Sequence, residues 1–187
     1  MAQVTEGAAS VPQTGSEGLV RILLPSPIGA LGLELRGEVA TELVIVPKGR
    51  QRARFTPFAR IEGSDFLDEV LGQLSEYFAG ARRTLQLDYD LSHHGLDRFA
   101  QRVLRQTARI RYGDTRTYQQ IANSAGRPNA YRNVLAVLST NPLPIIIPCH
   151  RVVTAKSGVG SYIGGVRKKE WLLRLEARSL ASGRFLY

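Results

Sequence analysis

Hydrophobic and polar residues alternate in the first patterned part of the chain, and a helical period follows. The alternation covers residues 19–47 and is interrupted by two Gly-containing turn segments, which predicts three strands in an antiparallel meander. Ser64 can cap a helix with an acidic first turn, and Gly80 is expected to end it. Apolar residues at helical spacing form one face of this helix, namely Phe66, Leu67, Val70, Leu71, Leu74 and Phe78.

The remaining segments of the first half carry weaker patterns. Residues 48–63 are basic and are expected to form a loop, whereas 84–89 predict a short strand before a linker at 91–95. Residues 1–18 are small and polar and predict a disordered tail. Residues 19–92 are therefore expected to form a small α+β scaffold domain.

The second half has the period of helices. Residues 96–110 place apolar side chains at helical spacing, and Thr117 followed by Gln120 forms a capping box at the start of the next helix. Gly126 breaks that helix, and another is expected to open at Pro128 and to run to about Leu138. Two helices joined by a short Gly-containing turn are typical of a helix-turn-helix unit.

The chain carries a formal net charge of +9, which is unevenly distributed. Residues 1–95 hold 9 Lys and Arg against 12 Asp and Glu, whereas residues 96–178 hold 15 against 4. This segregation favours a polyanionic partner, most simply nucleic acid, for the second half. With one Cys the chain forms no intramolecular disulfide and no cysteine-rich zinc site. No apolar run approaches the length of a membrane span, and a reducing, cytosolic setting is expected.

The single cysteine is the main candidate for chemistry. Cys149 follows an apolar run and a proline, and His150 and Arg151 come directly after it. Lone cysteines are mostly inert and buried. Pro148 suits the start of a helical turn, so the thiol is expected at a helix N-terminus beside two cations, where a lowered pKa would favour thiolate.

Four blocks around Cys149 resemble the O6-alkylguanine-DNA alkyltransferase family. They are 141–153 (NPLPIIIPCHRVV), 117–122 (TYQQIA), 160–165 (GSYIGG) and 169–176 (KEWLLRLE). The resemblance is dense over about residues 96–178 and looser before them, where 76–80 (EYFAG) is the most similar piece. It implies an α+β fold, with a small N-terminal α/β (RNase H-like) domain followed by a mostly helical winged helix-turn-helix domain over 96–180.

The resemblance also implies a reaction. The thiolate of Cys149 would take the alkyl group, chiefly methyl, from O6 of a flipped guanine and keep it as a thioether, so that each molecule acts once. His150 corresponds to a base acting through a water, and Glu176 to the residue that orients this base. Tyr118 corresponds to the proton donor to the leaving guanine, and Asn141 to a tie between the reactive turn and the recognition helix.

Further roles follow from the same resemblance. The expected DNA-binding residues are Arg132, which would fill the gap left by the flipped base, together with Gln119, Tyr118, Arg151 and Arg127. The expected pocket residues are Val152, Tyr162, Ile163, Gly164 and Leu138. No cofactor and no metal are expected. The expected partner is double-stranded DNA containing O6-alkylguanine, and the protein is expected to be a cytoplasmic or nucleoid-associated monomer without a membrane association.

Two positions depart from the family pattern, and three other functions compete with the first. Ile163 stands where the family has a small residue, so bulky adducts such as benzyl should react less well than methyl. Leu135 adds bulk to the recognition helix. The competing functions are a non-catalytic lesion-binding protein, a helix-turn-helix regulator with an incidental cysteine, and a Cys-His hydrolase. Taken alone, each of Arg132, Tyr118, Glu176 and Asn141 would also suit an ordinary structural role.

Overall fold

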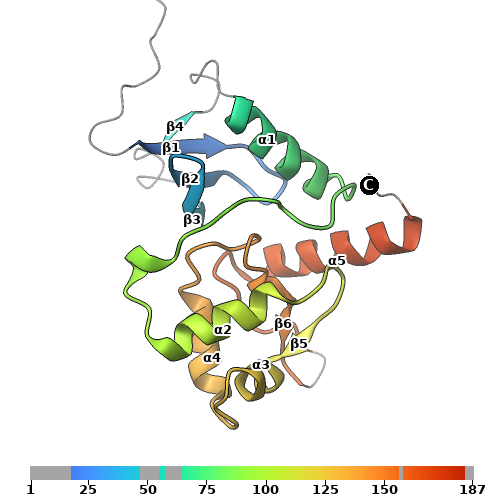
Figure 1. Cartoon of the computed structure of the whole chain (residues 1–187). Coiled ribbons are helices and arrows are strands. Elements are labelled where there is room, and N and C mark those ends of the chain that lie inside the picture. Colours follow the sequence, from blue (N-terminus) through green and yellow to red (C-terminus); the bar gives the residue numbers. More distant parts are fainter. Residues whose placement is uncertain (1–17, 47–54, 58–64, 156–157, 184–187) are drawn as a thin grey trace, which may run out of the picture.

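The computed structural model describes residues 18–46, 55–57, 65–155 and 158–183. The predicted tail lies outside these ranges apart from Gly18, and so does the predicted cap Ser64. Figure 1 shows a sheet with one helix beside it, above a group of helices. We call residues 18–90 the sheet region and residues 97–183 the helical region. The division into separate domains stays a prediction.

The sheet region contains the predicted meander. Strands β1, β2 and β3 pair antiparallel in sequence order, as expected. A fourth strand, β4, pairs parallel with β1 inside the segment expected to be a loop, so the sheet order is β3-β2-β1-β4. The predicted alternation buries the apolar side chains of β1 to β3 against α1. The bounds are β1 (Leu19–Leu24), β2 (Leu31–Arg36), β3 (Val39–Ile45), β4 (Thr56–Pro57) and α1 (Asp65–Phe78).

The predicted strand over 84–89 is wrong. This segment crosses between the sheet region and the helical region as an extended trace (Figure 1), and one bridge, between Ala40 and Tyr89, joins it to β3. This bridge consists of two backbone hydrogen bonds. The Ala40 amide donates to the Asp88 carbonyl, and the Asp90 amide donates to the Ala40 carbonyl. Gln73 of α1 holds the middle of the segment, because its side chain both donates to and accepts from the backbone of Gln86.

The helical region follows the predicted order. The capping box of Thr117 and Gln120 is present at the start of α3. Helix α4 begins at Tyr131 rather than at Pro128, because Asn129 adopts a left-handed φ of 69° that a helix cannot contain. The bounds are η3 (Ser92–His94), α2 (Arg98–Ala108), β5 (Arg116–Thr117), α3 (Tyr118–Ser124), α4 (Tyr131–Ser139), η4 (Cys149–Arg151), β6 (Val152–Val153) and α5 (Val166–Ser182).

The two regions pack against each other over a continuous apolar core. The amide of Leu43 in β3 donates to the carbonyl of Pro142 at 2.8 Å. At the end of α1, a side chain on Gly80 would lie 2.1 Å from the Ser179 hydroxyl of α5, so this close approach requires glycine. None of the helices within the described ranges is long and apolar enough to cross a membrane. This packing fixes α1 beside the elements that carry the reactive turn.

Candidate functional site around Cys149

The turn that carries Cys149 has an unusual backbone. Ile145 has a φ of 78°, which is a sterically costly conformation for a β-branched residue. The amides of Ile147 and Cys149 donate to the carbonyls of Leu143 and Ile147, each at 2.7 Å. This folding leads through Pro148 into the short helix η4, so Cys149 does lie at the start of a helical turn, as predicted.

Asn141 fixes this turn from the end of α4. Its side-chain amide donates to the Ile147 carbonyl at 2.9 Å, and its oxygen accepts from the Leu143 amide at 3.1 Å. Asn141 is buried, so both groups lie where water cannot replace them. The geometry suits the predicted tie between the reactive turn and the helix before it.

The environment of the thiol differs from the prediction. Cys149 is 3% exposed, and burial raises the pKa of its thiol to about 11. A hydrogen bond from Asn141 and the charge of Lys169 lower this pKa but are outweighed by the burial. The expected lowering by neighbouring cations is therefore wrong for this structure, which holds a neutral thiol.

Beside the thiol lies a small cavity of about 10 Å³, which has room for about one water. Tyr162 and Leu138 line it, as predicted for pocket residues. Ile163, Val152 and Gly164 were expected there too and are not among its lining residues. Ile163 is instead an exposed residue, with 45% of its surface accessible to solvent. The full lining consists of Tyr118, Leu135, Leu138, Ser139, Cys149, Ser161 and Tyr162.

His150 is held in one tautomer by Glu176. Nε2 of His150 lies 2.9 Å from Oε1 of Glu176, and both side chains are completely buried. Burial raises the pKa of Glu176, but hydrogen bonds and charges from His150 and Arg151 outweigh it and lower the pKa to about 2. Burial lowers the pKa of His150. An ionised carboxylate and a neutral imidazole require the shared proton on Nε2, so Nδ1 carries a free lone pair. Nδ1 hydrogen-bonds to none of the described residues.

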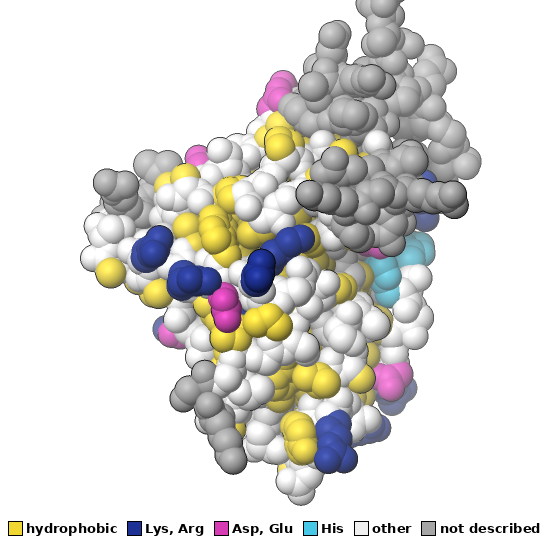
Figure 2. All heavy atoms as spheres, turned by 180° about the vertical axis from the view of Figure 1, so that it is seen from behind, with side chains coloured by type: hydrophobic (Ala, Val, Ile, Leu, Met, Phe, Trp, Pro, Cys, Tyr) yellow, Lys and Arg dark blue, Asp and Glu magenta, His cyan; other side chains and the backbone are white. Residues whose placement is uncertain are grey.

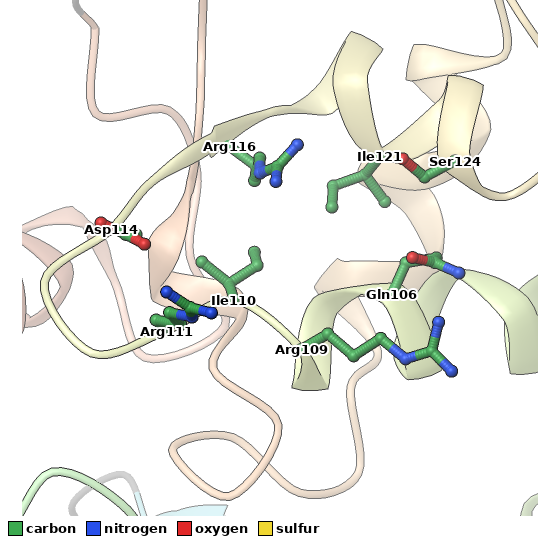
Figure 3. Close-up of a pocket in the computed structure, with 8 residues that line it drawn as sticks. All are labelled: Gln106, Arg109, Ile110, Arg111, Asp114, Arg116, Ile121 and Ser124. Carbon is green, nitrogen blue, oxygen red and sulfur yellow. The ribbon is translucent and has the colours of Figure 1, made fainter.

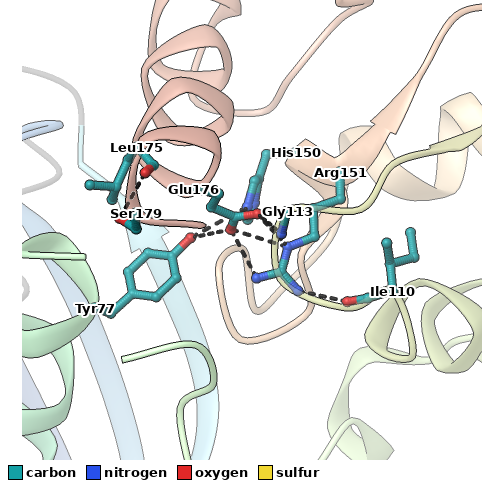
Figure 4. Close-up of polar contacts among 8 residues, drawn as sticks. All are labelled: Tyr77, Ile110, Gly113, His150, Arg151, Leu175, Glu176 and Ser179. Atoms are coloured by element: carbon teal, nitrogen blue, oxygen red, sulfur yellow. Dashed lines mark hydrogen bonds and ion pairs between the residues drawn. The ribbon is translucent and has the colours of Figure 1, made fainter. Parts of the chain in front are cut away.

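Arg151 does not lie on a DNA-accessible surface, which corrects the prediction for this residue. It is 4% exposed, and its guanidinium donates to both oxygens of Glu176 at 2.9 to 3.1 Å. Its remaining terminal nitrogen donates to the Ile110 carbonyl at 2.7 Å (Figure 4). A buried carboxylate needs a partner of this kind, so Arg151 belongs to the interior of the site.

Two more donors complete the shell of Glu176. The Gly113 amide donates to Oε2 at 2.9 Å, and the Tyr77 hydroxyl of α1 donates to Oε1 at 2.8 Å. Figure 4 shows these groups converging on the carboxylate from different elements. The same tyrosine hydroxyl lies 3.4 Å from Nε2 of His150. Glu176 is thus bonded on both oxygens by four residues.

Lys169 is a second buried charged residue of α5 near the reactive turn. Its ammonium is buried and donates to the carbonyls of Val152 at 2.5 Å and Ser161 at 3.1 Å. Burial lowers the pKa of Lys169 to about 8, and the charge of a Cys149 thiolate would raise it. The Tyr118 hydroxyl donates to the same Ser161 carbonyl at 3.3 Å. Lys169 and Tyr118 therefore hold the segment around Ser161 over the reactive turn.

The predicted DNA-contacting side chains lie on α3, α4 and the turn between them. Arg132 is exposed at the start of α4, 5.7 Å from the Tyr131 ring, and Arg127 lies 4.8 Å from the Phe99 ring. Gln119 of α3 donates to Asn123 at 2.8 Å. Figure 2 shows hydrophobic side chains exposed on the face behind that of Figure 1, with basic side chains beside them. Exposed large apolar residues include Tyr131, Leu135, Ile163 and Val166.

A larger polar pocket of about 410 Å³ shares no residue with the thiol cavity. Three arginines, Arg109, Arg111 and Arg116, surround it together with Asp114 (Figure 3). Its lining residues include Ser124 and Asp114 but no cysteine and no histidine, so the thiol and imidazole of Cys149 and His150 lie outside it. Among the described residues, no three His, Cys, Asp or Glu side chains lie together as metal ligands.

Comparisons with known proteins identify the family of this chain. Residues 98–178 match the family described as 6-O-methylguanine DNA methyltransferase, DNA binding domain. The methylated-DNA--protein-cysteine methyltransferase of Methanosarcina barkeri is 38% identical over 158 residues, which are 84% of this chain and 97% of the relative. This chain belongs to that methyltransferase family.

Other members of the methyltransferase family support the same conclusion. The Homo sapiens protein of the same name is 34% identical over 168 residues, with 86% of this chain and 81% of the relative covered. The crystal structure of Mycobacterium tuberculosis OGT in complex with DNA matches with a TM-score of 0.73 at 37% identity, covering 85% of this chain and 93% of that chain. The mixed α+β fold is therefore confirmed, while the narrower RNase H-like and winged-helix descriptions stay predictions.

The positions of three site residues were not predicted from the sequence, namely those of Lys169, Tyr77 and Arg151. Lys169 and Glu176 are seven residues apart on the buried face of α5, a spacing that places both side chains on one side of a helix. Tyr77 lies on the same face of α1 as Val70 and Leu74. Helical spacing could have indicated Lys169 and Tyr77, whereas nothing in the sequence distinguishes an internal Arg151 from a surface one.

Proposed function

We propose that this protein repairs DNA by transferring an alkyl group, chiefly methyl, from O6 of guanine to Cys149 in a single irreversible turnover. The family membership supports the reaction class, and the observation that carries the assignment is the buried pair of His150 and Glu176, of which His150 directly follows Cys149 in the short helix η4. The thiol is buried, and the imidazole next to it in the chain has a free Nδ1 and an Nε2 anchored by Glu176. The substrate is double-stranded DNA containing O6-alkylguanine, and no cofactor takes part.

Proton transfer within the site starts from neutral groups. In our proposal Nδ1 of His150 takes the thiol proton through one water, and the sulfur attacks the alkyl carbon. The carbon–oxygen bond breaks, and its electron pair stays on O6 of the departing guanine. The hydroxyl of Tyr162 is also buried without a hydrogen bond to any described residue, and its ring centroid lies 6.3 Å from that of His150. Two buried unpartnered polar atoms in one site support such a water.

Tyr118 supplies the proton for the leaving base. Burial raises the pKa of its phenol, so the hydroxyl stays protonated and can donate to the guanine anion as it forms. The imidazolium of His150 then returns its proton through the water to the phenolate. Sulfur ends as a thioether, and since no group in this scheme removes the alkyl carbon, the thiol is not regenerated.

The target base must leave the duplex and open the cavity. A space of about 10 Å³ holds no purine, so the segment around Ser161 moves when a flipped guanine enters. Arg132 would occupy the gap in the stack, and Gln119 and Arg127 would contact the backbone beside it. The carbonyls of Cys149 and Val152 would accept from the guanine amino group, and Lys169 would leave Val152 for this purpose. Tyr162 and Leu138 remain as walls of the opened pocket.

Intact mass spectrometry tests the proposal directly. The protein is mixed with a duplex that contains one O6-methylguanine, in parallel with Cys149→Ser. We expect a stoichiometric gain of one methyl group in place of the thiol hydrogen, and none in the variant. An unchanged mass despite DNA binding would contradict alkyl transfer.

A non-catalytic lesion-binding protein is the second candidate. The small size of the cavity and the neutral thiol favour it, because both slow attack on an alkyl group. It predicts tight binding of O6-methylguanine DNA with equal affinity for wild-type protein and Cys149→Ser, and no mass change in either.

A further inference from the structure

Tyr77 is the one residue of the sheet region that hydrogen-bonds to His150 or Glu176 among the described residues. It lies in the segment 76–80, which resembles the family and which the reaction scheme leaves without a role. Its hydroxyl donates to Oε1 of Glu176 at 2.8 Å and lies 3.4 Å from Nε2 of His150. Oε1 of Glu176 therefore accepts hydrogen bonds both from His150 and from Tyr77 of the sheet region.

The tyrosine ring is fixed by its neighbours. Phe78 and Tyr112 contact it edge to face, with ring centroids 5.4 and 5.9 Å away, and the side chain is 1% exposed. Burial raises the pKa of the Tyr77 phenol, so the hydroxyl remains a donor throughout the reaction. The contact of Phe78 with Trp171 of α5 holds this end of α1 against the helix that carries Glu176.

We propose that Tyr77 is a positioning residue that acts through Glu176, so that the sheet region sets the basicity of His150. This inference rests on the proposed alkyl transfer. The hydroxyl withdraws charge from Oε1, the oxygen that also accepts from Nε2. Without this donor, Oε1 would hold the imidazolium more strongly, because a carboxylate with fewer hydrogen bonds keeps more charge for its remaining partner. The pKa of His150 would rise, and neutral imidazole would become scarcer at neutral and acidic pH.

The test uses Tyr77→Phe, which removes only the hydroxyl, and Tyr112→Phe as a matched control. Tyr112 belongs to the same buried aromatic cluster, and its hydroxyl interacts with Ser179. Single-turnover rates of methyl transfer from an O6-methylguanine duplex are measured against pH for the three proteins. We expect Tyr77→Phe to react roughly ten-fold more slowly at neutral pH, as for the loss of one charged hydrogen bond. We also expect its acid limb to shift to higher pH, while Tyr112→Phe follows the wild type.

Three results would overturn the inference. They are an unchanged rate and pH profile in Tyr77→Phe, a slower rate with an unmoved acid limb, and an equal effect in Tyr112→Phe. Methyl transfer to wild-type Cys149 in the same assay keeps these results separate from a failure of the proposed function, which would leave every sample unmethylated.

A measurement on the wild-type protein covers the case in which Tyr77→Phe does not fold. The contact requires a Tyr77 hydroxyl proton that exchanges slowly with water and gives a nuclear Overhauser effect to the His150 ring. A Tyr77 hydroxyl in fast exchange would contradict the inference.

Discussion

The two sides of His150 are built in opposite ways. On the Nε2 side, Glu176 is bonded by Tyr77, Gly113 and Arg151 as well as by the imidazole. Nδ1 of the imidazole makes no hydrogen bond to a described residue. The thiol of Cys149 lies beside a cavity with room for about one water, and Tyr162, which lines that cavity, has its ring centroid 6.3 Å from that of His150. Both oxygens of Glu176 accept hydrogen bonds on the Nε2 side, whereas Nδ1 has no hydrogen-bond partner among the described residues.

The Nε2 side therefore fixes the orientation of the His150 ring, and the Nδ1 side remains available for the reaction. The saturated side can hold the ring and its tautomer without changing during the reaction, because every lone pair there has a donor. The open side keeps a neutral thiol and a neutral imidazole, so in the proposed reaction it stays unreactive until substrate and water complete it. The structure thus combines a rigid anchor with a nucleophile that is not ionised at rest.

Loss of the carboxylate is the most severe way to break this arrangement. Glu176→Gln should lower the alkyl-transfer rate about 100-fold or more, as for loss of an effective general base. It should also lower the free energy of unfolding by about 3 kcal/mol or more, because Arg151 would remain buried without a charge partner. Single-turnover kinetics and urea unfolding measure the two effects. Glu170→Gln, on the exposed side of the same helix, is the control, and equal behaviour of both variants would contradict the anchor.

Acid should weaken the saturated side in two steps. The pKa of His150 is lowered in the folded state, so stability is lost as pH falls below its ordinary value of 6.5. The pKa of Glu176 is lowered from 4.5 to about 2, so its contribution is complete above pH 4.5 and is lost as pH falls toward 2. The second step corresponds to about 3 kcal/mol. Urea unfolding at several pH values should show both steps in the wild type, and a flat profile would contradict the lowered values.

Removal of the Lys169 charge tests the open side. Lys169→Met keeps most of the volume but removes the cation that lowers the thiol pKa, so thiolate should become scarcer. We expect a roughly ten-fold slower alkyl transfer, equivalent to one pKa unit. Lys168→Met, with the charge outside the site, is the control. A rate for Lys169→Met within two-fold of the control would show that the ammonium has no influence on the thiol.

The smallest expected effect concerns the exposed Ile163. Ile163→Ala should raise the rate with O6-benzylguanine by roughly three-fold, less than a buried branched side chain would give, because Ile163 is not among the residues that line the small cavity beside the thiol. Val166→Ala provides a comparable exposed truncation. If the benzyl rate of Ile163→Ala does not exceed that of the control, Ile163 does not restrict the opened pocket.

Some elements of the fold could be predicted from the sequence, and others could not. The meander of β1 to β3 and the capping box at Thr117 followed from period and turn chemistry, which are local properties. Strand β4 has only two residues and pairs with a distant strand, so no local pattern indicates it. The left-handed φ of Asn129, which delays the start of α4, is a conformation that Asn adopts more readily than most residues, so a local signal was available there.

The residues of the site divide in the same way. Cys149, His150 and Glu176 followed from the resemblance, and the structure places His150 and Glu176 in contact. The pKa of the thiol did not follow, because it depends on burial and on where the cations point. Arg151 is directed inward by Glu176 and the Ile110 carbonyl, contacts made across 25 and 41 residues of sequence. The residues next to Cys149 in the sequence therefore predicted a lowered thiol pKa, whereas burial raises it.

Titration of the Cys149 thiol tests the central claim that nucleophile and base are both neutral at rest. Thiolate absorbance at 240 nm would be followed against pH for the wild type, with Cys149→Ser subtracted. We predict no thiolate at pH 7 and a transition near pH 11. A thiolate already formed at pH 7 would contradict the account and would point to a preformed ion pair with His150.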